Sequence, residues 1–183
     1  MNSELLNRVL KAMAPNRTVE SWLAGSSVLA SLLLRFPDDI DVHHVGRDAF
    51  DDAIRRDTDT LVCLGFVAGD FSASEFELET RFVHPHGDIA VNWVLEPTRP
   101  QYLIADPKIG VRASYGTVID RKIEMCKRDR LGKHRDDLLC LLRNELLLRP
   151  ETDIPWFRSQ LAALGLINAD FVTQPDHRHR RSV

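Results

Sequence analysis

The segment from Asp39 to Val45 constrains the fold most, because polar and apolar residues alternate along it from Asp39 to His43. In an extended chain, successive side chains point to opposite faces, so Ile40 and Val42 share one face. The opposite face carries polar side chains, those of Asp39, Asp41 and His43. This pattern predicts a strand with one buried face and one polar face.

A strand, a small-residue turn and a helix are expected directly before this segment. Residues 19–23 are rich in β-branched and aromatic side chains, which predicts a short buried strand. Gly25-Ser26-Ser27 predicts a turn, and apolar residues at helical spacing predict a helix from Val28 to about Arg35. Phe36-Pro37-Asp38 is expected to end that helix.

The remaining segments place strands in the first half of the chain and helices in the second. Helical patterns cover residues 3–14, 48–56 with a continuation to about 63, 117–128, 135–148 and 155–164. Strand patterns cover residues 65–67, 75–83 and 88–95, and Pro85-His86-Gly87 makes the last two an antiparallel hairpin. This order favours an α+β fold. We expect a core over residues 1–100, a helical part over 101–172 packed on it, and a disordered tail over 173–183.

Composition narrows the class of protein. The 183 residues are 44% hydrophobic and 28% charged, which suits a globular chain with a real core. The net charge of −3 argues against strong non-specific nucleic-acid binding. The longest apolar stretch is interrupted by glycine and serines, so we expect no membrane span. Three widely spaced cysteines are interpreted as reduced thiols in a cytoplasmic protein.

The turn and the alternating segment together predict a site for a metal ion and a phosphate. Asp39 and Asp41 point the same way from one strand, and two like charges that close favour a cation between them. Hard oxygen ligands of this kind suit Mg²⁺, which completes its shell with substrate phosphates. The turn at Gly25-Ser26 offers backbone N–H groups, a helix start and a hydroxyl donor to a phosphate. Either motif alone is common and often without function.

These residues also carry a family resemblance. The segments Leu23-Ala-Gly-Ser-Ser-Val-Leu-Ala and Arg35-Phe-Pro-Asp-Asp-Ile-Asp-Val resemble the signature of DNA polymerase β-type nucleotidyltransferases. Within that superfamily they are most similar to the nucleotidyl transferase AbiEii toxin-like proteins, which have an Arg shortly before the carboxylates. The resemblance implies a short mixed sheet flanked by helices, with a helical C-terminal half. It also implies that Gly25 and Ser26 hold phosphate and that Asp39 and Asp41 bind Mg²⁺.

A later segment resembles a second motif of the same family. Lys122 matches a Lys early in a helix, Arg128 matches an Arg two turns on, and Arg135-Asp136 matches a basic-Asp step. By this resemblance Lys122 neutralises nucleotide phosphates, Arg128 contacts them, and Asp136 orients Lys122 or caps the next helix. A further family Asp is replaced by Leu139, and Asp137 is a candidate shifted substitute. Without the first motif, a solvated helix Lys at residue 122 and an N-cap at Asp136 would be the preferred explanations.

The third carboxylate of polymerase β-type sites has no direct counterpart. The family pattern places it where this chain has Asn92, and Asp88 lies four positions earlier on the same predicted strand. Asn is a weak ligand and cannot take up a proton. Either Asp88 substitutes, or the site binds nucleotide without efficient transfer.

Three functions follow as hypotheses. The first is a Mg²⁺-dependent nucleotidyltransferase that uses a nucleoside triphosphate and modifies an RNA such as tRNA, a protein or a small molecule, with a toxin–antitoxin role implied by the resemblance. The second is a nucleotide-binding protein without turnover. The third is an interaction module whose partner is an antitoxin. A zinc site at His84, His86 and Asp88 and a hydrolase triad of Ser26, His43 and Asp39 are weaker alternatives.

Overall fold

The computed structural model describes residues 3–37, 39–129, 131–168 and 170, so the predicted tail at 173–183 lies outside the described residues. The chain divides into two compact units, Met1–Ser114 and Tyr115–Val183. Each unit is described by itself below.

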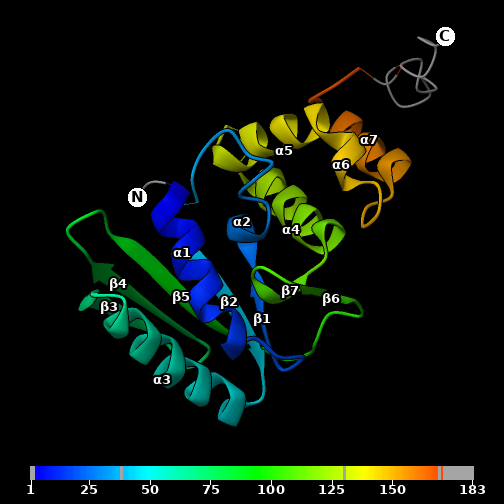
Figure 1. The fold of residues 1–183 in the computed structure, drawn as a ribbon. Coiled ribbons are helices and arrows are strands. Elements are labelled where there is room, and N and C mark those ends of the chain that lie inside the picture. The colour runs from blue at the N-terminus through cyan, green and yellow to red at the C-terminus, as the bar shows by residue number, and fades with distance from the viewer. Residues whose placement is uncertain (1–2, 38, 130, 169, 171–183) are drawn as a thin grey trace, which may run out of the picture. The chain divides into compact units, whose positions relative to one another are not determined.

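The first unit is built on a mixed sheet of seven strands in the described part of the chain (Figure 1). The strands are β1 (Ser21–Ala24), β2 (Asp39–Val45), β3 (Val67–Ala73), β4 (Glu77–Val83), β5 (Ile89–Glu96), β6 (Leu103–Asp106) and β7 (Gly110–Ala113). Their order across the sheet is β3-β4-β5-β2-β1-β7-β6. β2 runs parallel to β5 and β1 runs parallel to β7, while the other neighbours are antiparallel. The predicted hairpin of β4 and β5 is confirmed.

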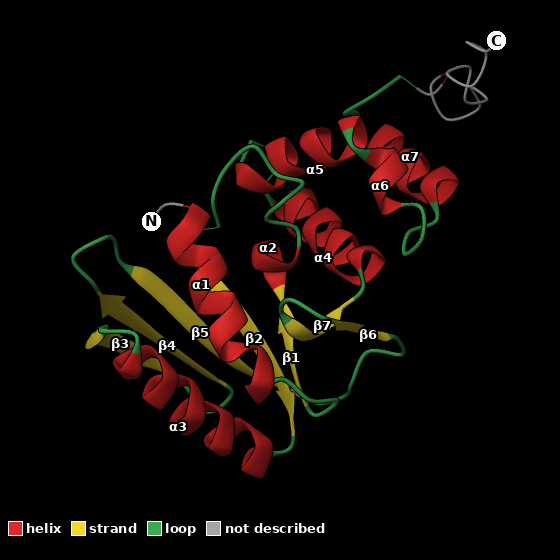
Figure 2. Ribbon diagram, in the orientation of Figure 1, coloured by secondary structure: helices red, strands yellow, loops and turns green. Residues whose placement is uncertain are grey.

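The central strand β2 has the two faces that its alternation predicted. Ile40 and Val42 are fully buried, whereas Asp39 and Asp41 on the opposite face are half-buried. Helices α1 (Ser3–Met13) and α3 (Arg47–Cys63) cover the sheet side by side (Figures 1 and 2). The core of the first unit therefore lies under these helices, and the side chains of Asp39 and Asp41 point away from it.

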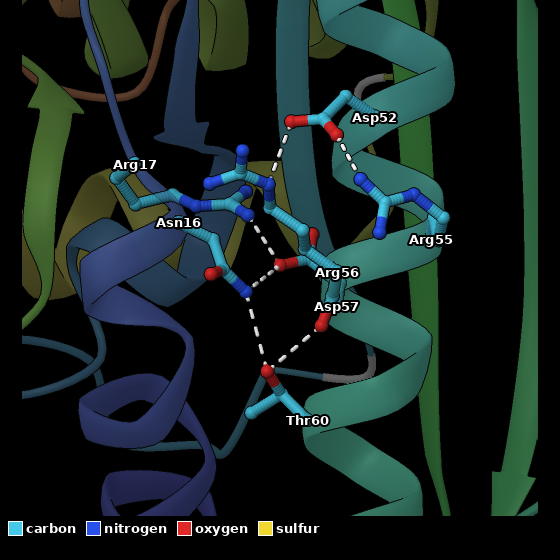
Figure 3. A network of polar contacts seen from close by, with 7 residues as sticks. All are labelled: Asn16, Arg17, Asp52, Arg55, Arg56, Asp57 and Thr60. Carbon is cyan, nitrogen blue, oxygen red and sulfur yellow. Dashed lines mark hydrogen bonds and ion pairs between the residues drawn. The ribbon is translucent and has the colours of Figure 1, made fainter.

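A buried polar network ties α3 to the sheet and to the short 3-10 helix η1 (Ala14–Asn16). Figure 3 shows its contacts with Asn16 and Arg17. Asp57, which is fully buried, forms an ion pair with the buried Arg17 and accepts a hydrogen bond from Asn16 Nδ2 at 2.9 Å. Its second oxygen accepts a hydrogen bond from Trp93 Nε1 of β5, also at 2.9 Å. The network thus holds β5 in place one residue beyond Asn92.

The second unit consists of helices in its described residues. These are α4 (Tyr115–Arg128), α5 (Lys133–Arg143), α6 (Glu145–Leu148) and α7 (Ile154–Ala163). The single helix expected over 135–148 is wrong in one respect, because it breaks at Asn144. The Asn144 side chain donates to the carbonyl of Cys140 at 3.3 Å, which competes with continued helical bonding.

The helix expected from Val28 to Arg35 is also wrong. Helix α2 covers only Gly25–Val28, and the chain continues through turns to residue 35. Leu29 and Leu32 are buried as their spacing suggested, but the Leu32 and Leu33 N–H groups both bond to Leu29. Serines have low helix propensity, and burial of the apolar side chains does not require a regular helix here.

The sequence patterns did not predict strands β6 and β7. β6 and β7 follow residue 100 and complete the sheet of the first unit, so that unit runs to Ser114 rather than ending near Pro100. β1 and β3 also lie slightly later than expected, since Val19 is exposed and Phe66 precedes β3. The cysteines are free, with Cys126 and Cys140 buried and Cys63 exposed. Within the described ranges, no helix has the length and apolar character needed to cross a membrane.

Candidate nucleotide and metal site

The two predicted carboxylates lie on the polar face of β2, at the end where β1 leads into α2. Asp41 is the cross-strand partner of Ala24 on β1 and of Asn92 on β5. Asp39, the first residue of β2, is the partner of Ala90 on β5. Asp39 and Asp41 are therefore two residues apart on one face, as the alternation of β2 requires.

Gly25 packs directly against the carboxylate of Asp41. Its φ of +62° lies in the left-handed region, which favours glycine. A Cβ added to Gly25 would overlap Oδ2 of Asp41 and would lie 2.6 Å from its Cγ. Any side chain at residue 25 would therefore displace the carboxylate. The structure brings the turn and the second aspartate into contact, as the sequence hypothesis requires of a shared site.

The turn binds a second polar residue that the candidate set did not include. Arg35 donates from Nη2 to the hydroxyl oxygen of Ser26 at 3.3 Å and from Nη1 to the carbonyl of Phe36 at 3.2 Å. Ser26 is buried and Arg35 is half-buried. The signal was present in the sequence, because the resemblance includes an Arg shortly before the carboxylates.

The expectation that a helix dipole contributes to anion binding at this turn is wrong. α2 has only four residues, and a helix that short has almost no aligned peptide dipole. An anion at Gly25-Ser26 would be bound by local N–H groups, the Ser26 hydroxyl and the Arg35 guanidinium instead. The positive charge near the turn comes from a side chain and not from a helix.

The register separates the two candidates for the third position. Asn92 is directly opposite Asp41, and its buried Oδ1 has no hydrogen-bond partner. Asp88 precedes β5, forms an ion pair with Arg81 at 2.7 Å and also accepts from the His84 N–H. The hydrogen bond from Arg81 lowers the pKa of Asp88 below its usual value, so this carboxylate is held by Arg81. Of the two residues, Asn92 occupies the position beside Asp41.

The donor atoms at this site suit a magnesium ion. Mg²⁺ binds through one or two carboxylates and takes its remaining ligands from phosphates and water. Asp39 and Asp41 supply the carboxylates, and the unpaired Oδ1 of Asn92 is a neutral oxygen on the adjoining strand. In the described part of the chain, no three His, Cys, Asp or Glu side chains are grouped so as to hold a metal. At the residues of the zinc alternative, His84 Nδ1 accepts from the His86 N–H at 3.1 Å and Asp88 pairs with Arg81.

The second unit holds an ion pair that differs from the expected one. Lys122 donates to Asp137 Oδ2 at 2.7 Å, and both side chains are almost fully buried. Asp136, which was expected to orient Lys122 or to cap the next helix, is exposed and pairs with its neighbour Arg135. It lies in the first turn of α5, whose N-cap is Gly132. Arg128 is exposed at the end of α4. Asp137 contacts Lys122 and Asp136 does not, because residue 137 of the helix is buried whereas residue 136 is exposed to solvent.

The first unit also has a pocket of about 450 Å³ at the other end of β2 and β5. It is lined by Gly46, Arg47, Phe76, Leu95, Glu96 and Pro97. Gly46 and Arg47 follow the end of β2, and Leu95 and Glu96 are the last residues of β5. Asp39 and Asp41 lie towards the start of β2. The pocket is therefore separate from the candidate site.

Comparison with solved structures identifies the fold. A structure described as "putative nucleotidyltransferase from H. pylori" superposes with a TM-score of 0.64 at 16% identity, covering 90% of this chain and 77% of that one. This chain has a nucleotidyltransferase-type fold. JHP933 from Helicobacter pylori gives a TM-score of 0.60 at 16% identity, covering 87% of this chain and 71% of the other. The predicted α+β, polymerase β-type fold is confirmed.

Sequence comparisons add no narrower assignment to the nucleotidyltransferase fold. No family model matches the chain, and no curated protein matches it. The AbiEii-like resemblance stays a prediction from the motifs.

Proposed function

We propose that this protein is a Mg²⁺-dependent nucleotidyltransferase that moves a nucleotidyl group from a nucleoside triphosphate to an acceptor hydroxyl. The observation that carries the proposal is the contact of Gly25 with the Asp41 carboxylate. It places a small-residue turn beside a strand carboxylate pair, the two components that nucleotidyl transfer needs for phosphate and metal. The nucleotidyltransferase-type fold supports the same class of reaction.

In this proposal, each site residue of the first unit has its own role. Asp39 and Asp41 hold the metal, and Gly25 leaves room for the Asp41 carboxylate beside the turn. When bound, Mg²⁺ would neutralise charge on the phosphates and on the departing pyrophosphate. Ser26 donates a hydrogen bond to a phosphate oxygen, and Arg35 adds a positive charge next to it. Exchange of the Arg35–Ser26 contact for contacts to phosphate would order the turn around the nucleotide.

In the second unit, the family resemblance suggests Lys122 and Arg128 as phosphate-binding residues. Lys122 is the proposed cation, and its contact with Asp137 fixes the position of its ammonium group. Arg128 is a second proposed phosphate contact. Asp136 remains a candidate catalytic residue on the basis of the resemblance, although Asp137 is the residue that contacts Lys122.

Label transfer tests the proposal directly. Wild-type protein is incubated with each labelled nucleoside triphosphate, Mg²⁺ and three acceptor classes, namely tRNA, protein and small hydroxyl compounds. We expect transfer to one class, and a fall of at least about 100-fold in Asp41→Asn, since the metal would lose a charged ligand. Asp59→Asn, an exposed aspartate on α3, is the matched control. Transfer without Mg²⁺, or equal transfer by Asp41→Asn, would overturn the proposal.

A toxin role is a narrower part of the proposal and rests on the resemblance to AbiEii toxin-like proteins. It implies a cognate antitoxin that blocks the activity. Induced expression in a bacterial host is expected to arrest growth with wild type and not with Asp41→Asn. Unchanged growth with an active enzyme would exclude the toxin role and leave the transferase proposal standing.

The position of Asn92 favours a second candidate, a nucleotide-binding protein without turnover. Asn92 lies beside Asp41 and cannot accept a proton from an attacking hydroxyl. This candidate predicts a rise in melting temperature with nucleoside triphosphate and Mg²⁺, through binding to the folded state alone, without product. Product formation by wild type would exclude it.

A further inference from the structure

Transfer to a hydroxyl requires a group that takes up the hydroxyl proton, and this requirement rests on the proposed function. A side-chain base within hydrogen-bonding reach of the attacking oxygen typically contributes about 10²- to 10⁴-fold to such a step. Asn92, directly opposite Asp41, is an amide and cannot serve. A carboxylate on the same face of the sheet as Asp41 would meet this requirement.

We infer that Glu79 of β4 is this base. The strand register places Asp41 opposite Asn92, and Asn92 opposite Glu79. Cross-strand partners point to the same face, so the three side chains form one row across β2, β5 and β4. The amide of Asn92 stands between the metal-binding carboxylate and a carboxylate that is free to accept a proton.

The spacing of the row fits a hydroxyl held between the two carboxylates. Neighbouring strands lie about 4.8 Å apart, so the backbones of Asp41 and Glu79 are roughly 10 Å apart. A base has to come within about 3 Å of the attacking oxygen to take up its proton. Glutamate has one more methylene than aspartate, and this added length lets Glu79 lean across Asn92.

Two other charged or titratable side chains near this row pair with residues outside it. On β4, Arg81 follows Glu79 on the same face and pairs with Asp88. His43 binds Glu96 at 2.8 Å, one step further along β2. Glu79 itself is exposed and makes no hydrogen bond or ion pair with any described residue. Its partner on β3 is Ser72, which carries no charge.

The step balances without another reactant. The acceptor oxygen forms a bond to the α-phosphorus, and the bond from that phosphorus to the bridging oxygen of the β-phosphate breaks. The bond's electron pair leaves with pyrophosphate, and the hydroxyl proton moves to the Glu79 carboxylate. The proton then passes from Glu79 to solvent, because the side chain is exposed.

Steady-state transfer by the full chain tests the inference. Glu79→Gln is expected to lower kcat about 100-fold while KM for the nucleotide changes less than about 3-fold, because the base acts in the transition state. Glu77→Gln is the matched control, as Glu77 is exposed on the same strand and face but lies opposite Val94. It is expected to keep kcat within about 3-fold.

Placing a carboxylate at the centre of the row, at residue 92, gives a second test. Asn92→Asp in the Glu79→Gln background is expected to restore kcat at least about 10-fold, because a proton acceptor returns beside Asp41. Equal kcat in Glu79→Gln and Glu77→Gln, or no rescue by Asn92→Asp, would overturn the inference while leaving the transferase intact. If wild type transfers nothing, the proposed function fails and the inference fails with it.

Discussion

At the scale of single residues, Gly25 is the position that tolerates the fewest other amino acids. Its left-handed backbone and its contact with Asp41 both exclude a side chain. Gly25→Ala is therefore expected to abolish Mg²⁺-dependent nucleotide binding, because the new methyl group displaces the Asp41 carboxylate. Isothermal titration with a nucleoside triphosphate and Mg²⁺ measures this directly.

Gly46→Ala separates the two effects at Gly25. Gly46 also has a positive φ, of +88°, but an added Cβ there would meet no atom within 4 Å. Both variants are expected to lose about 1–3 kcal/mol of stability from backbone strain, but only Gly25→Ala should lose binding. Retained binding in Gly25→Ala would show that the Asp41 contact is not part of a nucleotide site.

At this scale, the sequence predicted those site residues whose spatial relation depends only on a short separation along the chain. Asp39 and Asp41 were predicted because a strand puts residues two apart on one face. The choice of Asp137 over Asp136, and the approach of Glu79 to Asn92, depend on helix facing and strand register. Those relations are set by packing between distant segments, which a local pattern does not encode.

At the scale of elements, helix α3 is held to β5 through one buried carboxylate. Asp57→Asn keeps the size of the side chain but leaves the buried Arg17 cation without its counter-charge. Two nitrogens of Arg17, Nε and Nη1, already have no hydrogen-bond partner. We expect a loss of about 3–5 kcal/mol in the free energy of unfolding, measured by urea titration.

Asp52→Asn is the control on the same helix. Asp52 pairs with Arg55 and with Arg56 at the surface (Figure 3), where ion pairs contribute about 0–1 kcal/mol. Equal losses in the two variants would mean that the network at Asp57 does not fix α3 to the sheet.

The elements that the sequence predicted well have a strong and uninterrupted pattern. In β2, polar and apolar residues alternate from Asp39 to His43, and α3 shows a long amphipathic run. β6 and β7 have four residues each, and a hairpin that short gives too few alternations to distinguish from a loop. The turn between them depends on Asp106, whose carboxylate accepts from the N–H groups of Lys108 and Ile109.

At the scale of the whole molecule, global stability is coupled to pH through a histidine behind the site. His44 lies on the core face of β2, fully buried, with its ring edge-on to Phe50 at 5.6 Å. Neither ring nitrogen has a hydrogen-bond partner. Burial, aided by the positive charge of Arg17, lowers the pKa of His44 from 6.5 to about 3.

The direction of the pH effect follows from this lowered pKa. Above pH 6.5 neither the folded nor the unfolded chain protonates His44, and its contribution to stability is constant. Between pH 6.5 and about 3, the unfolded chain binds a proton that the folded chain excludes, so stability falls as the pH falls. We expect this residue to account for a loss of about 2 kcal/mol between pH 7 and pH 5.

Comparison with His44→Leu isolates this contribution from that of other groups. Asp88 and Asp106 also have lowered pKa values, but their effect develops as the pH falls below the ordinary carboxyl value of 3.8. Urea unfolding at pH 7 and pH 5 should therefore show a loss in wild type that is about 2 kcal/mol larger than in His44→Leu. His86→Gln, which changes an exposed histidine, should behave as wild type does. Parallel losses in wild type and His44→Leu would mean that His44 is protonated, or solvated, in the folded protein.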